Sequence, residues 1–369
     1  MAYRGPGLRT VQLDLQYQNT IPGPPASAGD LWEKATSGDT VTIDTWRKQW
    51  VDQYKHAAER FGNFGDKTVG KLYKTNLYKP AICLGSGPSL KHTLDALKEN
   101  RALENPVLTV SCLHNFALLE DNECHADYYV TLDAGDVVMH DTTELGGKDA
   151  EHYWEKTEGK TLIAYVASPP ALWEKWRGDV YLFNCMVPDD QYRKQTEAIQ
   201  VFRHYVSSGG NCLGACVYIA KAIMGSNPII FAGADFSFDY DNTFHPVATK
   251  YDNFNGKGIG GYLVATDVFG VTRKTWPSYY NFKCFFDNLV QRCPGEWINC
   301  SEGILGAYKE GNIEQFKYMT LSEALLPYKI VEHVFYAETK PDGTAGEKEK
   351  INWREVWAQP EYKTNLVLY

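Results

Sequence analysis

The chain has 369 residues, a length that suits about two domains, and 44% of its residues are hydrophobic. Its 37 Lys and Arg against 46 Asp and Glu give a formal net charge of −9. That balance argues against nucleic acid or an anionic membrane surface as the main partner, because both need a basic footprint. No apolar stretch approaches the roughly 20 residues that span a bilayer, and the N-terminus lacks the apolar core of a secretory signal. We therefore expect a cytoplasmic globular protein with no membrane span.

The N-terminal part divides at two changes in composition. Residues 1–40 are rich in Gly, Pro, Ser and Thr without sustained periodicity, which predicts an extended arm. Residues 41–78 contain a predicted amphipathic helix at 45–61, with Asp44 as its N-cap, and then a polar linker.

From residue 79 to 330, short apolar stretches alternate with helical ones, and a mixed tail follows at 331–369. The apolar stretches are continuous rather than alternating, as in strands buried on both faces, and the intervening helices imply parallel crossovers. The predicted fold class is therefore α/β, with a doubly wound, mostly parallel Rossmann-type sheet. The strands of this region are expected at 81–84, 107–112, 128–132, 161–167, 180–183 and 228–232, followed by a β pair at 263–266 and 271–273, a helix at 276–290 and a strand at 297–299.

Nine cysteines occur, an odd number without any C-x-x-C pair, and most lie in apolar stretches. Free thiols in such places behave as small hydrophobic side chains, so we expect reduced core residues. Cys212 and Cys216 would share one face of a helix, but no further ligand stands near them in the sequence, and we expect no metal there.

Ligands of open α/β sheets bind beyond the carboxyl ends of the strands. The first strand leads into Gly85-Ser86-Gly87-Pro88-Ser89, where glycines allow close backbone approach and Pro88 opens a helical turn whose free N–H groups suit an anion. The same residues also suit an ordinary strand-to-helix turn. A second small-residue turn, Ser207-Ser208-Gly209-Gly210, opens another helix. We predict that both turns contact a nucleotide.

Polar residues that follow other strands complete the predicted site. Asn115 could contact a base or ribose, or it could cap the next helix. Asp133 is predicted to be functional, whereas Asp136 is interpreted as a solvated turn residue. Asp235 lies at the carboxyl end of a strand, and His245 on the loop beyond it has the near-neutral titration that a general acid or base needs.

Two motifs imitate phosphate or metal sites. Residues 65–71 resemble a P-loop, but Leu72 replaces the Ser or Thr that binds the metal, and no strand precedes them. Asp239-Tyr240-Asp241 resembles a D-x-D metal site but lies in a polar loop, where such triplets arise by chance. The sequence predicts no resident metal site.

In their order along the chain, these segments resemble the MptE-like family, named for 6-hydroxymethylpterin diphosphokinase and including the central domain of the Maf flagellin glycosyltransferases. The shared pattern is a GxGPSL turn, a strand ending in Asp, a small-residue helix start, a G-x-D strand end, a downstream His and the N-x-x-E-G segment at 299–303. The bacterial CMP-sialyltransferases are similar over the GxGPSLK turn and the G-x-D-F at 233–236. By that resemblance the turns at Gly85 and Ser208 would hold a nucleotide, and His245 would be the general base.

Three alternative functions remain, the first two implied by the resemblance and the third suggested by the segments outside the family domain. The first is a glycosyltransferase with a CMP-activated acidic sugar as donor and an unidentified acceptor. The second is Mg²⁺-dependent pyrophosphoryl transfer from ATP to a hydroxymethylpterin-like alcohol, with Asp133, Asp136 and Asp235 as candidate carboxylates. The third is a non-catalytic assembly module that docks on protein partners through the 1–40 arm and the 331–369 tail.

Overall fold

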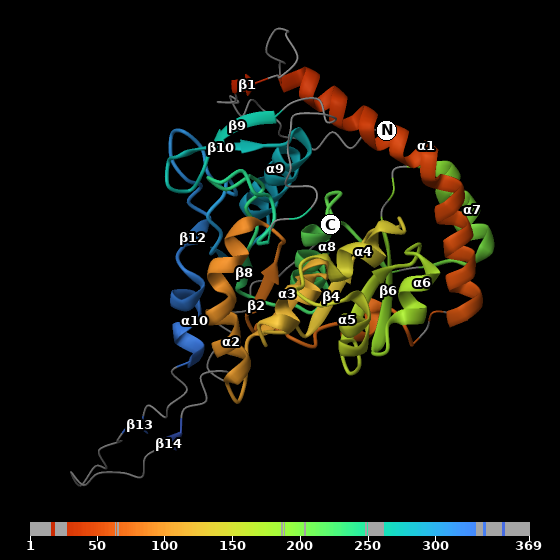
Figure 1. Cartoon of the computed structure of the whole chain (residues 1–369), viewed down its shortest axis with the longest axis horizontal. Coiled ribbons are helices and arrows are strands. Elements are labelled where there is room, and N and C mark those ends of the chain that lie inside the picture. The colour runs from red at the N-terminus through yellow and green to blue at the C-terminus, as the bar shows by residue number, and fades with distance from the viewer. Residues whose placement is uncertain are drawn as a thin grey trace.

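The protein is described by a computed structural model over residues 16–18, 28–62, 64, 66–185, 187, 189–202, 204–247, 249, 262–329, 335–336 and 349–350 (Figure 1). Most of the predicted arm and of the predicted tail lies outside the described residues. No helix within the described part of the chain is long and apolar enough to cross a bilayer.

A nine-stranded sheet forms the centre of the molecule, and all of its neighbouring strands are parallel. The predicted α/β class with a doubly wound parallel sheet is confirmed. The central strands β2 and β8 are buried at every residue, as their continuous apolar sequences indicated. In spatial order the strands are β12 (Phe316–Tyr318), β11 (Trp297–Asn299), β8 (Ile229–Ala232), β2 (Ala81–Leu84), β3 (Leu108–Cys112), β4 (Tyr128–Thr131), β5 (Thr161–Tyr165), β6 (Asp179–Cys185) and β7 (Tyr205–Val206).

The direction in which strands are added reverses beside β2. The strands β3 to β7 extend the sheet on one side of β2, and β8, β11 and β12 extend it on the other. Ala81 accordingly pairs with Leu108 on one side and with Ile229 on the other. Right-handed crossovers in opposite directions leave a crevice at the carboxyl ends of the two strands that flank such a switch point. The ends of β2 and β8 are therefore where this fold places a ligand.

Helices cover both faces of the sheet. Helix α8 (Cys212–Tyr218) packs on β2, β3 and β4 and continues into a π-helical turn at Ile219–Ile223. Helix α9 (Pro277–Arg292) sets Phe286 edge-on against Phe231 of β8. The other helices and turns are η1 (Val69–Leu72), η2 (Pro88–Thr93), α2 (Leu94–Ala102), η3 (Leu113–Asn115), α3 (Phe116–Asp121), α4 (Val137–Glu144), α5 (Ala150–Lys156), α6 (Pro170–Lys175), α7 (Asp190–Ile199) and α10 (Leu321–Lys329).

The first helix is longer than the sequence predicted. Helix α1 runs from Ala28 to Phe61, so the predicted start at residue 45 was wrong, and Asp44 lies inside the helix instead of capping it. The Gly, Pro, Ser and Thr content of residues 1–40 predicts an extended arm, and for residues 28–40 that prediction is wrong. Helix propensity is a weak preference that the rest of a fold often overrides. Figure 1 shows α1 as a long strap across the top of the view, from the side of α9 to α7.

A small antiparallel sheet lies beside α9. The predicted β pair is present as β9 (Tyr262–Thr266) and β10 (Thr272–Thr275), and β1 (Gln16–Gln18) of the N-terminal arm adds a third strand to it. A further two-stranded pair is formed by β13 (Phe335–Tyr336) and β14 (Glu349–Lys350).

Candidate functional site

The turns after β2 and β8 interlock at the switch point. Gly85 N–H donates to Ala232 O (2.9 Å), and Gly87 N–H donates to Gly233 O (2.8 Å). A Cβ added at Gly85 would lie 2.4 Å from Gly233 O, and one at Gly87 would lie 2.3 Å from Asp235 Oδ2. The two glycines of the G-x-G turn are therefore required by the neighbouring turn itself, whether or not a ligand approaches.

Asp235 joins three loops at this point. Its side chain is buried, and its Oδ2 accepts from Ser89 N–H (2.8 Å) while its Oδ1 accepts from Glu302 N–H (3.0 Å). Burial raises the pKa of this carboxyl, and the hydrogen bonds from Ser89 and Glu302 only partly offset that rise. With both oxygens occupied by backbone N–H groups, Asp235 holds the β2 turn against the loop after β11. Asp235 was predicted to be catalytic, but its observed contacts are those of a residue that positions the two turns.

The remaining residues of the β2 turn differ in exposure. Ser86 and Gly87 are half-buried, whereas Pro88 opens η2 as predicted and is buried together with Ser89. The solvent-facing side of the turn is therefore Ser86 and the Gly87 backbone.

A cation stands beside this turn. Lys91 Nζ lies 3.1 Å from Asp239 Oδ2, and Asp239 also accepts hydrogen bonds from Thr243 and from Asp241 N–H. Burial raises the pKa of Asp239, but the bonds from Thr243 and Lys91 outweigh it and hold the pKa below its usual range. Asp239 of the D-x-D triplet thus orders its own loop and ties it to η2.

Asn115 is fully buried beneath the β2 turn. Its Nδ2 donates to Gly85 O (3.0 Å) and to Ser111 Oγ (3.1 Å), and its side chain makes no capping hydrogen bond to α3. The capping alternative is therefore wrong. A direct contact of Asn115 with a base or ribose stays a prediction, and the observed contact supports the turn from below.

His245 meets two residues that the sequence did not single out. It is buried, its ring lies edge-on to that of His114 with centroids 4.7 Å apart, and its Nδ1 lies 3.4 Å from Thr249 Oγ1. His114 Nε2 in turn lies 3.3 Å from Glu144 Oε2. Burial lowers the pKa of His114 more than Glu144 raises it, which favours a neutral imidazole near pH 7. Glu144 lies on α4, 30 positions from His114 in the sequence, and no local motif signals the contact.

An aromatic group meets His245 through Phe244. Phe244, Phe238, Trp276 and Tyr279 form a compact group, with centroids 4.3 Å apart for Phe244 and Trp276 and 4.7 Å apart for Phe244 and His245. Such a wall excludes water and lowers the local dielectric, which strengthens any charge interaction of the imidazole.

Asp133 and Asp136 follow β4. Asp133 is half-buried and its Oδ1 accepts from Gly135 N–H (2.7 Å), while Asp136 is exposed, as a solvated turn residue would be. Burial raises the pKa of Asp133, and the bond from Gly135 opposes the rise. Asp133 is therefore partly exposed to solvent, whereas Asp235 is buried.

The second small-residue turn lies at the start of α8. Ser207 and Gly210 are exposed, Ser208 and Gly209 are half-buried, and Ser208 Oγ accepts from Gly210 N–H (3.3 Å). Gly209 and Gly210 have φ of +61° and +82°, the left-handed region that favours glycine. Asn211 then caps α8 by accepting from Gly214 N–H (2.8 Å). The ends of this turn, Ser207 and Gly210, are exposed, whereas a Cβ added at Gly209 would lie 2.5 Å from Phe285 Cδ1.

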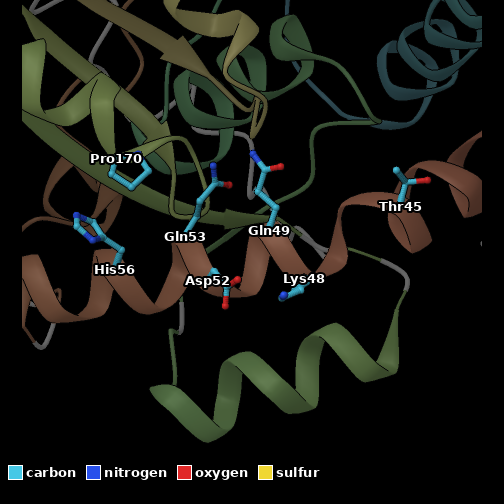
Figure 2. Close-up of a pocket in the computed structure, with 7 residues that line it drawn as sticks. All are labelled: Thr45, Lys48, Gln49, Asp52, Gln53, His56 and Pro170. Atoms are coloured by element: carbon cyan, nitrogen blue, oxygen red, sulfur yellow. The ribbon is translucent and has the colours of Figure 1, made fainter.

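An open hollow of about 550 Å³ lies along α1 (Figure 2). Figure 2 shows its lining on α1, with Pro170 of α6 opposite; the residues are Thr45, Lys48, Gln49, Asp52, Gln53, His56 and Pro170. Gln49 Nε2 reaches Ala134 O (3.5 Å), next to Asp133, but none of the predicted site residues lines the hollow. The candidate site is therefore the crevice at the strand ends, not this hollow.

Comparison with known proteins agrees with the resemblance seen in the sequence. The model of the family described as 6-hydroxymethylpterin diphosphokinase MptE-like matches residues 54–241, just over half of the chain. The match includes every predicted site residue except His245. No curated protein matches the chain.

Among solved structures, the chain is similar to the Maf glycosyltransferase of Magnetospirillum magneticum AMB-1, with 15% sequence identity and a TM-score of 0.49. The similarity covers 73% of this chain and 38% of that one, so the present chain corresponds to well under half of that protein.

Proposed function

The chain belongs to the MptE-like family, and from this premise we propose that it is a nucleotide-dependent transferase: a glycosyltransferase whose donor is a CMP-activated acidic sugar. The nucleotide would lie across the turns at Gly85–Ser89 and Ser207–Gly210. His245 would be the general base. Of the predicted carboxylates, Asp235 would position the β2 turn, and Asp133 would meet a hydroxyl of the donor or the acceptor.

The contact of His245 with His114 carries this proposal. A base for glycosyl transfer must take the proton of the acceptor hydroxyl while that oxygen forms a bond to the anomeric carbon. The bond from the anomeric carbon to the phosphate oxygen then breaks, and its electron pair leaves with CMP. His245 has the required environment, since the aromatic group excludes water and His114, anchored by Glu144, fixes one side of its ring.

The second candidate, Mg²⁺-dependent pyrophosphoryl transfer from ATP, is favoured by the description of the family. Its chemistry needs carboxylate oxygens that can hold Mg²⁺. Asp235 is buried and each of its oxygens already accepts a backbone N–H, Asp133 has one oxygen engaged by Gly135, and Asp136 is exposed to solvent. The donor set predicted from the sequence therefore fits Mg²⁺ poorly, which ranks this reaction below glycosyl transfer.

A non-catalytic assembly module is the third candidate. It is favoured by the β2 turn, whose glycines are explained by packing alone, and by β1, through which the N-terminal arm adds to the small sheet.

Ligand-induced thermal stabilisation separates the three. The purified chain is heated with CMP, CDP, ATP or GTP, each with Mg²⁺ or with EDTA. A ligand at 100 times its Kd stabilises the folded state by about 2.7 kcal/mol. Stabilisation by CMP that survives EDTA supports the glycosyltransferase, and stabilisation by ATP that needs Mg²⁺ supports the diphosphokinase. Absence of any shift contradicts both enzymes and leaves the assembly module.

The role of His245 is tested with His245→Gln. We expect this variant to keep the CMP-dependent thermal shift and to lose release of CMP from CMP-N-acetylneuraminate. The matched control is His152→Gln, at a half-buried histidine on α5 that packs on Tyr153. Equal CMP release by His245→Gln and the unmodified chain would refute the assignment of the base.

A further inference from the structure

Three cysteines from distant parts of the sequence meet below the predicted site. Cys112 ends β3, Cys212 opens α8, and Cys216 lies one helical turn further on α8. Their sulfur atoms all lie within 4.8 Å of one another. The sequence offered no third ligand for Cys212 and Cys216, and the packing of α8 on β3 supplies it. No other group of three cysteines gathers in this way among the described residues.

The spacing of these sulfurs is close to that of a thiolate metal site. Zinc–sulfur bonds of about 2.3 Å in tetrahedral geometry set neighbouring sulfurs about 3.8 Å apart. From separations of at most 4.8 Å, the triangle needs to contract by about 1 Å or less. Rotation of the side chains about their Cα–Cβ bonds can supply such a movement.

The exposure of Cys212 is also suitable for a bound ion. Cys112 and Cys216 are buried, whereas Cys212 is half-buried and gives an ion a path from solvent. When protonated, Cys212 donates to Val130 O at a distance of 2.8 Å. A divalent cation held by three thiolates would carry a net charge of −1, and three sulfur ligands would leave the fourth tetrahedral position for a water or another donor.

We propose that Cys112, Cys212 and Cys216 bind one soft metal ion of the zinc class through their three sulfurs. Binding displaces the thiol protons to solvent and forms three metal–sulfur bonds. It involves no change of oxidation state. The ion ties the start of α8 to the end of β3, so it clamps two of the loops that border the predicted nucleotide site. The proposal does not depend on what that site transfers.

Cobalt is the spectroscopic probe for this site. The full-length chain is reduced, freed of metal and titrated with Co²⁺. We expect sulfur-to-cobalt charge-transfer absorption that saturates at one equivalent and disappears when Zn²⁺ is added. Cys112→Ser, Cys212→Ser and Cys216→Ala should each lose this absorption. Cys284→Ser, at another half-buried thiol, on α9, is the matched control and should keep it.

A second measurement needs no variant and stays decisive if a substitution prevents folding. X-ray absorption at the zinc edge of the unmodified chain with one equivalent of Zn²⁺ should show three sulfur neighbours at about 2.3 Å. Nitrogen and oxygen neighbours alone, or Co²⁺ absorption that persists in all three cysteine variants, would overturn the proposal. So would the absence of any thiolate absorption at saturating Co²⁺, because the sulfurs would then be core packing only.

Discussion

Gly87 is the position where the packing of the two turns can be tested most directly. In Gly87→Ala the added Cβ would lie 2.3 Å from Asp235 Oδ2 and 2.7 Å from Gly233 O. Real Cβ atoms essentially never approach closer than 3.0 Å, so Oδ2 or the turn must move by about 0.7 Å. Asp235 cannot yield freely, because the same oxygen accepts Ser89 N–H and its partner oxygen accepts Glu302 N–H.

The cost follows from these contacts. Overpacking of a rigid site costs roughly 1–3 kcal/mol, and a weakened hydrogen bond to a buried carboxylate costs about 1.5–3 kcal/mol. The alanine restricts the unfolded chain, which returns about 0.4–1 kcal/mol. We therefore expect Gly87→Ala to lower the free energy of unfolding by about 3 kcal/mol. Gly147→Ala is the matched control: its Cβ would meet only Asp121 Oδ2, at an ordinary 3.6 Å. Its free energy of unfolding should change by less than about 1 kcal/mol.

Urea unfolding of the nucleotide-free proteins, followed by tryptophan fluorescence, measures both effects. A Gly87→Ala variant as stable as Gly147→Ala would refute the packing argument. If Gly87→Ala kept its stability but lost the stabilisation by nucleotide, Gly87 would be needed because the ligand approaches its backbone. Loss of stability without nucleotide therefore marks a glycine needed by the fold, and loss of binding at unchanged stability marks one needed by the ligand.

Three further predictions concern buried or paired charges. Asp235→Asn can accept only one of two backbone N–H groups, so urea unfolding should show a loss of about 2–4 kcal/mol; an unchanged midpoint would contradict its joining role. Burial lowers the pKa of Lys221 from 10.5 to about 8. Between these pH values the unfolded chain binds more protons than the folded one, so the free energy of unfolding should rise with pH, by at most about 3 kcal/mol. Lys221→Met should flatten this rise, and an equal rise in the variant would exclude Lys221 as its source. Asp189 caps α7 and pairs with Arg47 of α1, so Asp189→Ala should cost about 1–2 kcal/mol and speed proteolysis within α1, whereas the exposed Asp190→Ala should change neither.

The sheet could be predicted because its strands are buried on both faces. Stretches such as 81–84 and 228–232 are apolar at every residue, and the alternation with helices then dictates parallel pairing. The helices α4 and α5 were not predicted, since eight and seven residues show too little of the helical period to be recognised. The start of α1 was misplaced for a different reason: residues 28–40 contain Gly, Ser and Thr without sustained helical periodicity, so local preference does not favour a helix there.

The place of the site could also be predicted, but only part of its geometry. The rule that ligands bind at strand ends identifies the turns at Gly85 and Ser208, because a strand end is a local feature. The contact of His114 with Glu144, and that of Cys112 with Cys212, join segments 30 and 100 positions apart. Such pairs become visible only when the order of the strands is known. For the same reason the sequence could locate Asp235 at a strand end but could not tell that both of its oxygens are occupied.

A residue that the fold itself needs is a poor test of function, because its substitution changes stability first. Gly85, Gly87 and Asp235 belong to the pattern of the family, yet their contacts are with one another across the switch point. A chain that had lost its chemistry would still need them in order to pack β2 beside β8. The contacts of His245 are instead with side chains outside the G-x-G turn, namely His114, Phe244 and Thr249. Substitutions at His245 therefore test the proposed transfer more directly, whereas substitutions in the G-x-G turn first test the fold.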